Sequence, residues 1–134
     1  MTRVLALDYG SARCGYAISD PTGVLATPGG VVNAPTSRRG LARLSTLVDE
    51  LQVGRVVVGL PLRLAGGESA QTREARAFAA LLTERLRVPV ECYDERFTTT
   101  LAARDGGSAP EDARAAAHLL SSWLAAHGHE SEDG

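Results

Sequence analysis

The chain has 134 residues, of which 44% are hydrophobic and 22% charged, proportions typical of one globular domain with room for a core. Its net charge of −2 argues against a protein that coats nucleic acid through an overall positive charge, but leaves room for a local basic groove. No apolar run approaches the length of a membrane span, and the first residues lack the apolar segment of a signal peptide. We therefore expect a cytoplasmic protein with no membrane partner.

Two further observations concern the positively charged residues and the cysteines. All 14 positively charged residues are arginines. The guanidinium group suits phosphate contacts, but a codon bias of the genome would produce the same composition. Cys14 and Cys92 are far apart, lack metal-type spacing and fall in predicted strands, so we expect both to be buried free thiols.

The first half of the chain predicts three strands and a helix. They cover residues 4–8, 14–18 and 24–32 for the strands and about 37–52 for the helix. Gly10 permits a tight turn between the first two strands, and the third strand is interrupted near Pro28. The helix carries Leu41, Leu44 and Leu47 at the spacing of one buried face.

The second half predicts a strand, a long helix, a last strand and two further helices. They cover residues 55–61, 70–86, 88–93, 99–104 and 110–126. Thr98 suits the N-cap of the short helix. We expect one domain over residues 1–127, followed by a flexible acidic tail over 128–134.

This order of elements predicts an α/β fold with a mixed five-stranded sheet. Three antiparallel strands come first, and crossover βαβ units then add parallel strands, with helices covering both faces. The first strand is expected to be central, and residue 8 would then stand at the middle of the sheet's carboxyl edge.

Three acidic residues stand where the fold would bring them to that edge. Asp8 ends the first strand, Glu95 follows the last strand, and Asp112 lies in the first turn of the last helix. Because α/β sheets bind ligands at the carboxyl ends of their strands, these carboxylates are candidates for one shared site. Other interpretations stay open, since Asp8 also suits a turn cap and Asp94 and Glu111 lie beside two of the candidates.

Three carboxylates are hard oxygen ligands that suit Mg²⁺ or Mn²⁺ rather than zinc. Two such ions about 4 Å apart can activate a water and stabilise the departing oxygen of a phosphodiester. His118 is the only histidine before residue 127, and no Ser-His-Asp arrangement is evident. The glycines near residue 66 match neither a P-loop nor a dinucleotide fingerprint.

Five segments together resemble the YqgF family, also called RuvX. They are LALDYGSARCGYAISDPTG, VVVGLPL, GESAQTREARAFA, DERFTTTLA and EDARAAAHLLSSWL, and they follow the family's order over nearly the whole chain. The proteins of this family are RNase H-like, and they are described as Holliday-junction resolvases and as pre-16S ribosomal RNA nucleases. The resemblance therefore implies that residues 1–127 form a single RNase H-like nuclease domain.

The resemblance also implies a role for individual residues. Asp8 corresponds to the acid of the first strand, Glu95 to the acid of the DER motif and Asp112 to the acid of the last helix. These three would be the catalytic residues and the ligands of Mg²⁺ or Mn²⁺, with two ions expected. The residues expected to bind nucleic acid are Gly10, Arg13, Arg96 and Thr98, although Arg13 and Arg96 could instead neutralise the acidic site.

The implied activity is metal-dependent hydrolysis of phosphodiester bonds, first of all in processing the 5′ end of precursor 16S rRNA during ribosome biogenesis. A Holliday-junction or flap DNA nuclease of recombination and repair is the alternative, and a non-catalytic nucleic-acid-binding module is the second alternative. The partner is nucleic acid in each case, either precursor rRNA or branched DNA. The small size and the relatives also suggest a weak homodimer.

Two features refine the resemblance. Glu95 follows the outermost strand and must reach across about one strand spacing to meet Asp8, and Gly59, with no side chain, would leave that path open. The chain departs from the family at Ala12, Arg63 and Ala65, and its connection before Asp112 is shorter than the lysine-bearing loop of many relatives.

Overall fold

The computed structural model describes residues 3–61, 69–97 and 109–133. The elements in this part of the chain are β1 (Arg3–Asp8), β2 (Arg13–Ser19), β3 (Ala26–Asn33), α1 (Arg38–Glu50), β4 (Val53–Leu60), α2 (Ala70–Arg85), β5 (Val90–Asp94), the 3₁₀ turn η1 (Glu95–Phe97) and α3 (Glu111–Asp133). Thr98 and the expected helix over 99–104 lie outside the described residues. None of the helices in the described ranges is both long and apolar enough to cross a bilayer.

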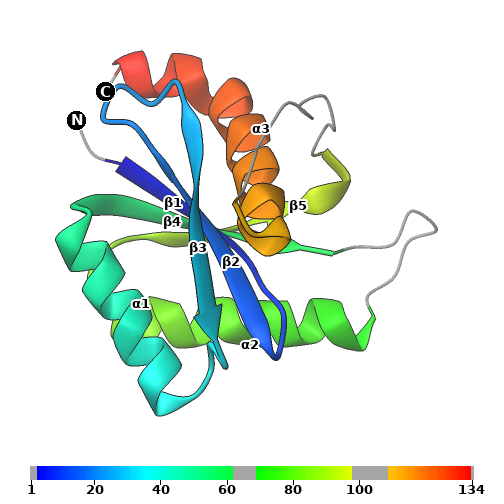
Figure 1. Cartoon of the computed structure of the whole chain (residues 1–134). Helices are drawn as coiled ribbons and strands as arrows, with labels where there is room; N and C mark the ends of the chain where they lie inside the picture. The colour runs from blue at the N-terminus through cyan, green and yellow to red at the C-terminus, as the bar shows by residue number, and fades with distance from the viewer. Residues whose placement is uncertain (1–2, 62–68, 98–108, 134) are drawn as a thin grey trace.

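The five strands form one sheet in the order β3-β2-β1-β4-β5. β1 pairs antiparallel with β2 and parallel with β4, which confirms the mixed sheet and the central position of β1. Helix α3 covers one face of the sheet, and α1 and α2 cover the other (Figure 1). Because β3 runs parallel to β1, the strands β1, β3, β4 and β5 all end at the same edge.

Alternation along β1 divides the core between the two faces. Leu5 and Leu7 pack on the side of α1 and α2, while Val4 and Ala6 pack on the side of α3. The chain therefore turns Asp8, the next residue in the second series, toward α3. The two apolar clusters hold the sheet between the two helical layers.

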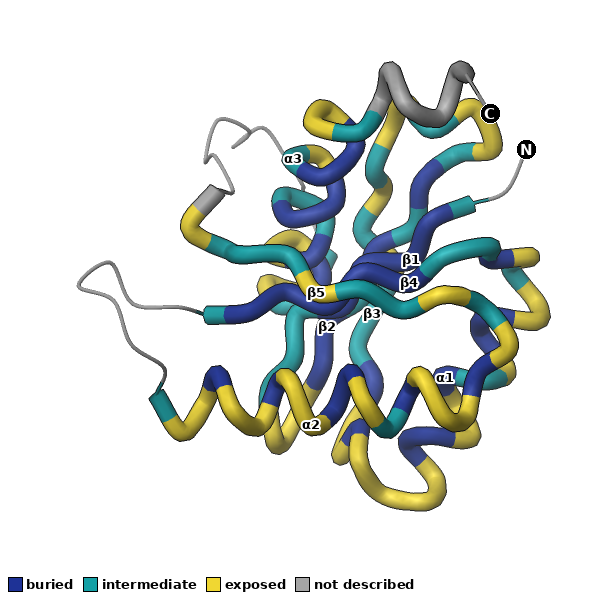
Figure 2. The backbone as a smooth tube through the Cα atoms, turned by 180° about the vertical axis from the view of Figure 1, so that it is seen from behind, coloured by how far each residue is buried: buried dark blue, intermediate teal, exposed yellow. Residues whose placement is uncertain are grey.

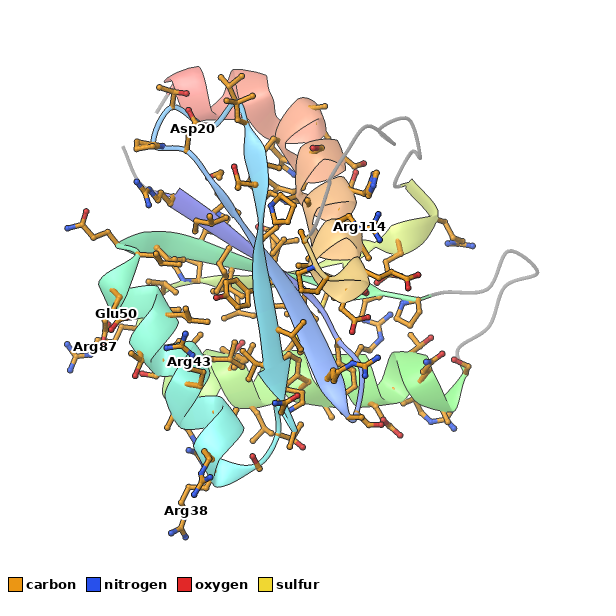
Figure 3. The ribbon with its side chains drawn as sticks, viewed as in Figure 1. Asp20, Arg38, Arg43, Glu50, Arg87 and Arg114 are labelled. Carbon is orange, nitrogen blue, oxygen red and sulfur yellow. The ribbon has the colours of Figure 1, made fainter. Side chains whose placement is uncertain are left out.

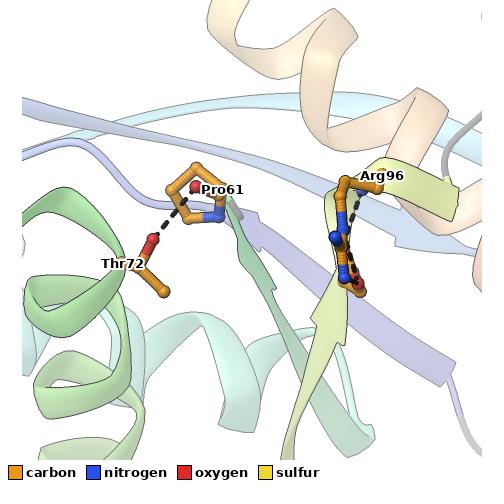
Figure 4. A network of polar contacts seen from close by, with 4 residues as sticks. Pro61, Thr72 and Arg96 are labelled. Carbon is orange, nitrogen blue, oxygen red and sulfur yellow. Dashed lines mark hydrogen bonds and ion pairs between the residues drawn. The ribbon is translucent and has the colours of Figure 1, made fainter. Parts of the chain in front are cut away.

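Helices α1 and α2 each begin at a serine cap. The Ser37 side chain accepts a hydrogen bond from the amide of Gly40 at 2.9 Å, and Ser69 caps α2 in the same way. Both helices bury the side that faces the sheet and expose the other (Figure 2). The Thr72 hydroxyl donates to the carbonyl oxygen of Pro61 at 3.0 Å, which ties the start of α2 to the end of β4 (Figure 4).

Helix α3 is attached to β5 through Glu91. One carboxylate oxygen of Glu91 accepts from Arg55 at 2.6 Å, and the other accepts from the indole nitrogen of Trp123 at 2.9 Å. His127 stacks on Trp123 with ring centroids 4.2 Å apart. These contacts hold the middle of α3 over the outer strands, so that its first turn points at the edge where β1 ends.

Two local predictions are wrong. β3 is continuous through Pro28, and the register shift in its pairing with β2 makes Gly29 the extra residue of a bulge, which an edge strand tolerates. Helix α3 also continues to Asp133, past the predicted end at Ala126, because no proline follows and a single glycine costs only about 1 kcal/mol within a helix.

The prediction for the cysteines is half right. Cys14 is fully buried and Cys92 is exposed, and both are free thiols. Cys92 lies on β5, which is an edge strand, so the helical layers cover its faces only in part.

Candidate active site

Asp8 lies at the end of the central strand and faces α3. Its strand neighbour in β2 is Gly15, and on the other side Leu7 pairs with Val58 of β4, which places Gly59 beside Asp8. Two glycines therefore flank this carboxylate on the α3 face. Because neither glycine carries a side chain, other groups can approach Asp8 closely on this face.

Glu95 lies directly above Gly59. A Cβ atom at residue 59 would stand 2.5 Å from Oε2 of Glu95 and 3.0 Å from a methyl of Leu119, so only glycine leaves this space. The carboxyl of Glu95 reaches Asp8 and shares a hydrogen bond with it. The expectation that Gly59 leaves the path open is confirmed.

Asp112 approaches from the other side, above Gly15. A Cβ atom at residue 15 would collide with the backbone carbonyl of Asp112, so Gly15 lets the first turn of α3 lie directly on β2. The charge of Asp112 acts on Asp8, and one of its oxygens accepts a hydrogen bond from Nε of Arg13 at 2.9 Å. The Arg13 side chain is 64% exposed, and an ion pair so open to water contributes at most about 1 kcal/mol.

The pKa values reflect this crowding of carboxyl groups. Burial raises the pKa of Glu95 to about 7, and the negative charge of Asp8 and the hydrogen bond with it act in the same direction. Burial also raises the pKa of Asp8, and the Asp112 charge adds to this, while the hydrogen bond from Glu95 acts the other way. At neutral pH, Asp8 and Glu95 share a proton for part of the time.

The four residues expected to bind nucleic acid have different surroundings. Gly10 is required by the turn, because a Cβ atom there would stand 2.6 Å from the carbonyl oxygen of Arg13. Arg96 forms two or more hydrogen bonds with the carboxylate of Asp94, the nearest 2.7 Å long (Figure 4). Thr98 lies outside the described residues. Arg13 thus pairs with a candidate site acid, whereas Arg96 pairs with a neighbour of one.

Gly15 is the residue that the sequence interpretation missed. A lone glycine inside a strand often marks a close approach of another backbone, and the strand 14–18 contains one. Nothing in the sequence identified the approaching backbone as that of Asp112, which is 97 positions further along the chain.

Comparison with known proteins identifies the family. The family model described as "RuvX: Holliday junction resolvase" matches residues 2–126. The chain belongs to the RuvX family. A protein of Anaeromyxobacter sp. (strain Fw109-5) is 44% identical over 131 residues, covering 91% of this chain and 96% of the relative. A protein of Mycobacteroides abscessus is 41% identical over 133 residues, covering 91% and 80%. Both carry the name "Putative pre-16S rRNA nuclease".

Solved structures support the fold. RuvC of T. thermophilus in complex with a Holliday junction substrate aligns with a TM-score of 0.62 at 18% identity, over 96% of each chain. The same protein in a second structure gives a TM-score of 0.61 at 17% identity. This RuvX-family chain therefore has the RNase H-like fold, and the names of its relatives place it among the nucleases.

A divalent metal is the cofactor that this fold class suggests. Within residues 3–61, 69–97 and 109–133, no group of three or more histidine, cysteine, aspartate or glutamate side chains is arranged to hold a metal ion. The carboxyls of Asp8 and Glu95 nevertheless meet where two glycines leave space for them, and the oxygen of Asp112 is engaged by an exposed arginine. Hard oxygen donors with surplus negative charge fit a hard cation.

Proposed function

We propose that this RuvX-family chain is a divalent-metal-dependent nuclease that processes the 5′ end of precursor 16S rRNA. The observation that carries the proposal is the meeting of the Asp8 and Glu95 carboxyls at the end of the central strand, beside the first turn of α3. Such a surplus of buried negative charge is unfavourable unless a cation offsets it. The names of the relatives supply the substrate, and an rRNA substrate implies action in the cytoplasm.

Asp8, Glu95 and Asp112 would hold Mg²⁺ or Mn²⁺, and two ions suit phosphodiester hydrolysis. When bound, the metal supplies an activated water and offsets the charge that develops on the leaving oxygen. Asp8 is positioned by the most central strand of the sheet, and Gly59 gives Glu95 its place above it. Metal binding requires both carboxyls to be ionised, so Glu95 must release the proton it shares with Asp8.

Arg13 would serve this chemistry by exchange of partners. In the metal-free protein, its guanidinium is bound to Asp112. Because that pair is exposed and weak, Arg13 can turn to a phosphate of the substrate when Asp112 turns to a cation. Arg96 and the Gly10 turn lie at the same edge and would contribute further contacts to the backbone of the nucleic acid.

A Holliday-junction nuclease is the second candidate, favoured by the description of the family and by the likeness of the fold to RuvC. The fold by itself accommodates either polymer, since a protein distinguishes RNA from DNA chiefly through contacts to the 2′-hydroxyl and through helix shape. The substrate test must therefore include both polymers.

The test compares labelled precursor rRNA with labelled junction DNA, in Mg²⁺ or Mn²⁺, for the wild type and Asp8→Asn. Asn keeps the shape of the turn but is a much poorer metal ligand, so we expect at least a hundredfold loss of cleavage rate with unchanged folding. Cleavage of the junction but not the rRNA would favour the second candidate. Near wild-type cleavage by Asp8→Asn would show that the proposed metal site is wrong.

A further inference from the structure

We propose that an arginine patch on the first half of α1 binds the phosphate backbone of the RNA strand that leads away from the candidate active site. The patch consists of Arg38, Arg39 and Arg43. All three side chains are exposed, and none has a hydrogen-bond or ion-pair partner among the residues that the structure describes. Arg38 points away from the body of the protein at the first turn of α1, with Arg43 further along the helix (Figure 3). This inference rests on the proposed nuclease function.

The patch lies at the same edge of the sheet as the acids. β3 runs parallel to β1 and leads into α1, so the start of α1 stands at the edge where Asp8 ends its strand. Arg13 is paired with Asn33 at the end of β3, and the amide of Ala34 donates to the carbonyl of Ala12 at 2.9 Å. β1 and β3 are two strand spacings apart, or about 10 Å. Because α1 covers the face opposite α3, an RNA strand bound at Asp8 would cross this edge of the sheet past Arg13 to reach the patch.

The charges of α1 are unfavourable for the isolated protein. Arg38 and Arg39 occupy its first turn, where the helix dipole repels cations, and Arg39 and Arg43 form a like-charged pair four residues apart. The other helices carry the opposite arrangement, with Glu111 and Asp112 in the first turn of α3 and Arg85 in the last turn of α2. A polyanion bound to α1 would offset both the repulsion between the helix dipole and these cations and the repulsion between Arg39 and Arg43.

The two halves of α1 also differ in whether charges of opposite sign lie near one another. At its far end, Asp49 lines a hollow of about 490 Å³ together with Arg85 and Arg87, so charges of both signs lie around it. Residues 38–45 include three arginines and no acid. A chain with a net charge of −2 thus concentrates three uncompensated positive charges on α1, which starts at the edge of the sheet where Asp8 ends its strand, and this patch is complementary to RNA phosphates.

The experiment measures binding of a labelled single-stranded RNA of about 20 nucleotides by fluorescence anisotropy over a range of salt concentrations. Excess EDTA prevents cleavage, so the readout does not depend on nuclease activity. The variant is Arg39→Gln/Arg43→Gln. The matched control is Arg85→Gln/Arg87→Gln, which removes the same charge from the opposite edge of the sheet.

We expect the α1 variant to bind RNA about tenfold more weakly, with a salt slope lower by about 1.4, the contribution of two phosphate contacts to a single strand. Its melting temperature should equal or exceed that of the wild type, because a like-charged pair is removed. The control should bind as the wild type does. Equal RNA affinity and equal salt slope for the two variants would show that the patch does not bind RNA and would indicate that α1 faces another partner. If the patch behaves as expected but precursor rRNA is never cut, the proposed function fails and this inference stands.

Discussion

At the ends of β1, β2 and β4, the two faces of the sheet are built differently, and the difference lies between consecutive residues of β2 and of β4. On the face covered by α1 and α2, Cys14 and Val58 are fully buried and extend the apolar core to the ends of the strands. On the face covered by α3, their neighbours Gly15 and Gly59 have no side chains, and the space holds the backbone of Asp112 and the carboxyl of Glu95. At these strand ends, apolar side chains fill one face for stability, whereas glycines leave the other face open to a polar site.

The difference has a price in stability. A glycine within a strand destabilises it by about 0.5 to 1 kcal/mol, and the carboxyls placed above Gly59 repel each other. The apolar packing of the opposite face offsets both effects. We infer that this protein keeps glycine at both positions because the acids need the space, and the comparison predicts different outcomes for substitutions on the two faces.

The sharpest test substitutes the neighbours Val58 and Gly59. Gly59→Ala forces the Glu95 carboxyl to move, because the new methyl would stand 2.5 Å from Oε2, and we expect about a hundredfold loss of cleavage rate. Val58→Ala opens a cavity on the filled face and should cost about 2 kcal/mol of unfolding free energy with little change in rate. Cleavage assays and urea unfolding measure the two effects. If Val58→Ala lost as much activity as Gly59→Ala, the two faces would not be functionally distinct.

A divalent ion should bind at the α3 face of these strand ends and thereby stabilise the native protein. Binding to the native state adds about 2.7 kcal/mol at a concentration a hundredfold above the dissociation constant. We expect Mn²⁺ to raise the melting temperature of the wild type, and to do so much less in Asp8→Asn, which retains the fold and loses one ligand. A wild-type melting temperature indifferent to millimolar Mn²⁺ would argue against a preformed site.

The pH dependence of the metal-free protein tests the crowding of the acids. The pKa of Glu95 is raised from 4.5 to about 7 in the folded state, so the native protein binds more protons than the unfolded chain between these values. The stability that this proton contributes is complete below about pH 4.5 and is lost as the pH rises through about 7.

We expect Glu95→Gln to flatten this loss in urea unfolding experiments in EDTA, and to be more stable than the wild type at about pH 8 by on the order of 1 kcal/mol, a value discounted for solvent screening. Glu84→Gln, which removes an exposed carboxylate from α2, is the matched control and should follow the wild-type profile. A wild-type profile in Glu95→Gln would contradict the proposed crowding.

The smallest effects are expected for the arginines at the rim of the acidic face. Arg13→Ala and Arg96→Ala should each weaken binding of nucleic acid several-fold and lower the salt slope by about 0.7 to 0.9. The unfolding free energy should change by less than about 1 kcal/mol, because the side chains of both arginines are open to water, 64% exposed for Arg13 and 35% for Arg96. Binding titrations at several salt concentrations provide the measurement. If the salt slope were unchanged in both variants, the two arginines would serve only to neutralise nearby acids.

Much of the fold followed from local patterns. The apolar run before Asp8 and the leucine spacing of α1 each specify an element through interactions between near neighbours, and the structure has these elements where they were expected. The order of strands followed as well, since crossover connections restrict parallel strands to few arrangements. Exposure of Cys92 did not follow, because it depends on how far distant helices extend over an edge strand.

For the candidate site, the sequence by itself determined which acids stand at the ends of elements, and that Gly59 would leave room between Asp8 and Glu95. Only the tertiary structure decided that Gly15 lies beneath the backbone of Asp112 and that Arg13 pairs with Asp112, two contacts between β2 and α3. The physical reason is the range of the interactions. Element formation depends on residues a few positions apart, whereas these contacts depend on where the packing of α3 against the whole sheet places its first turn.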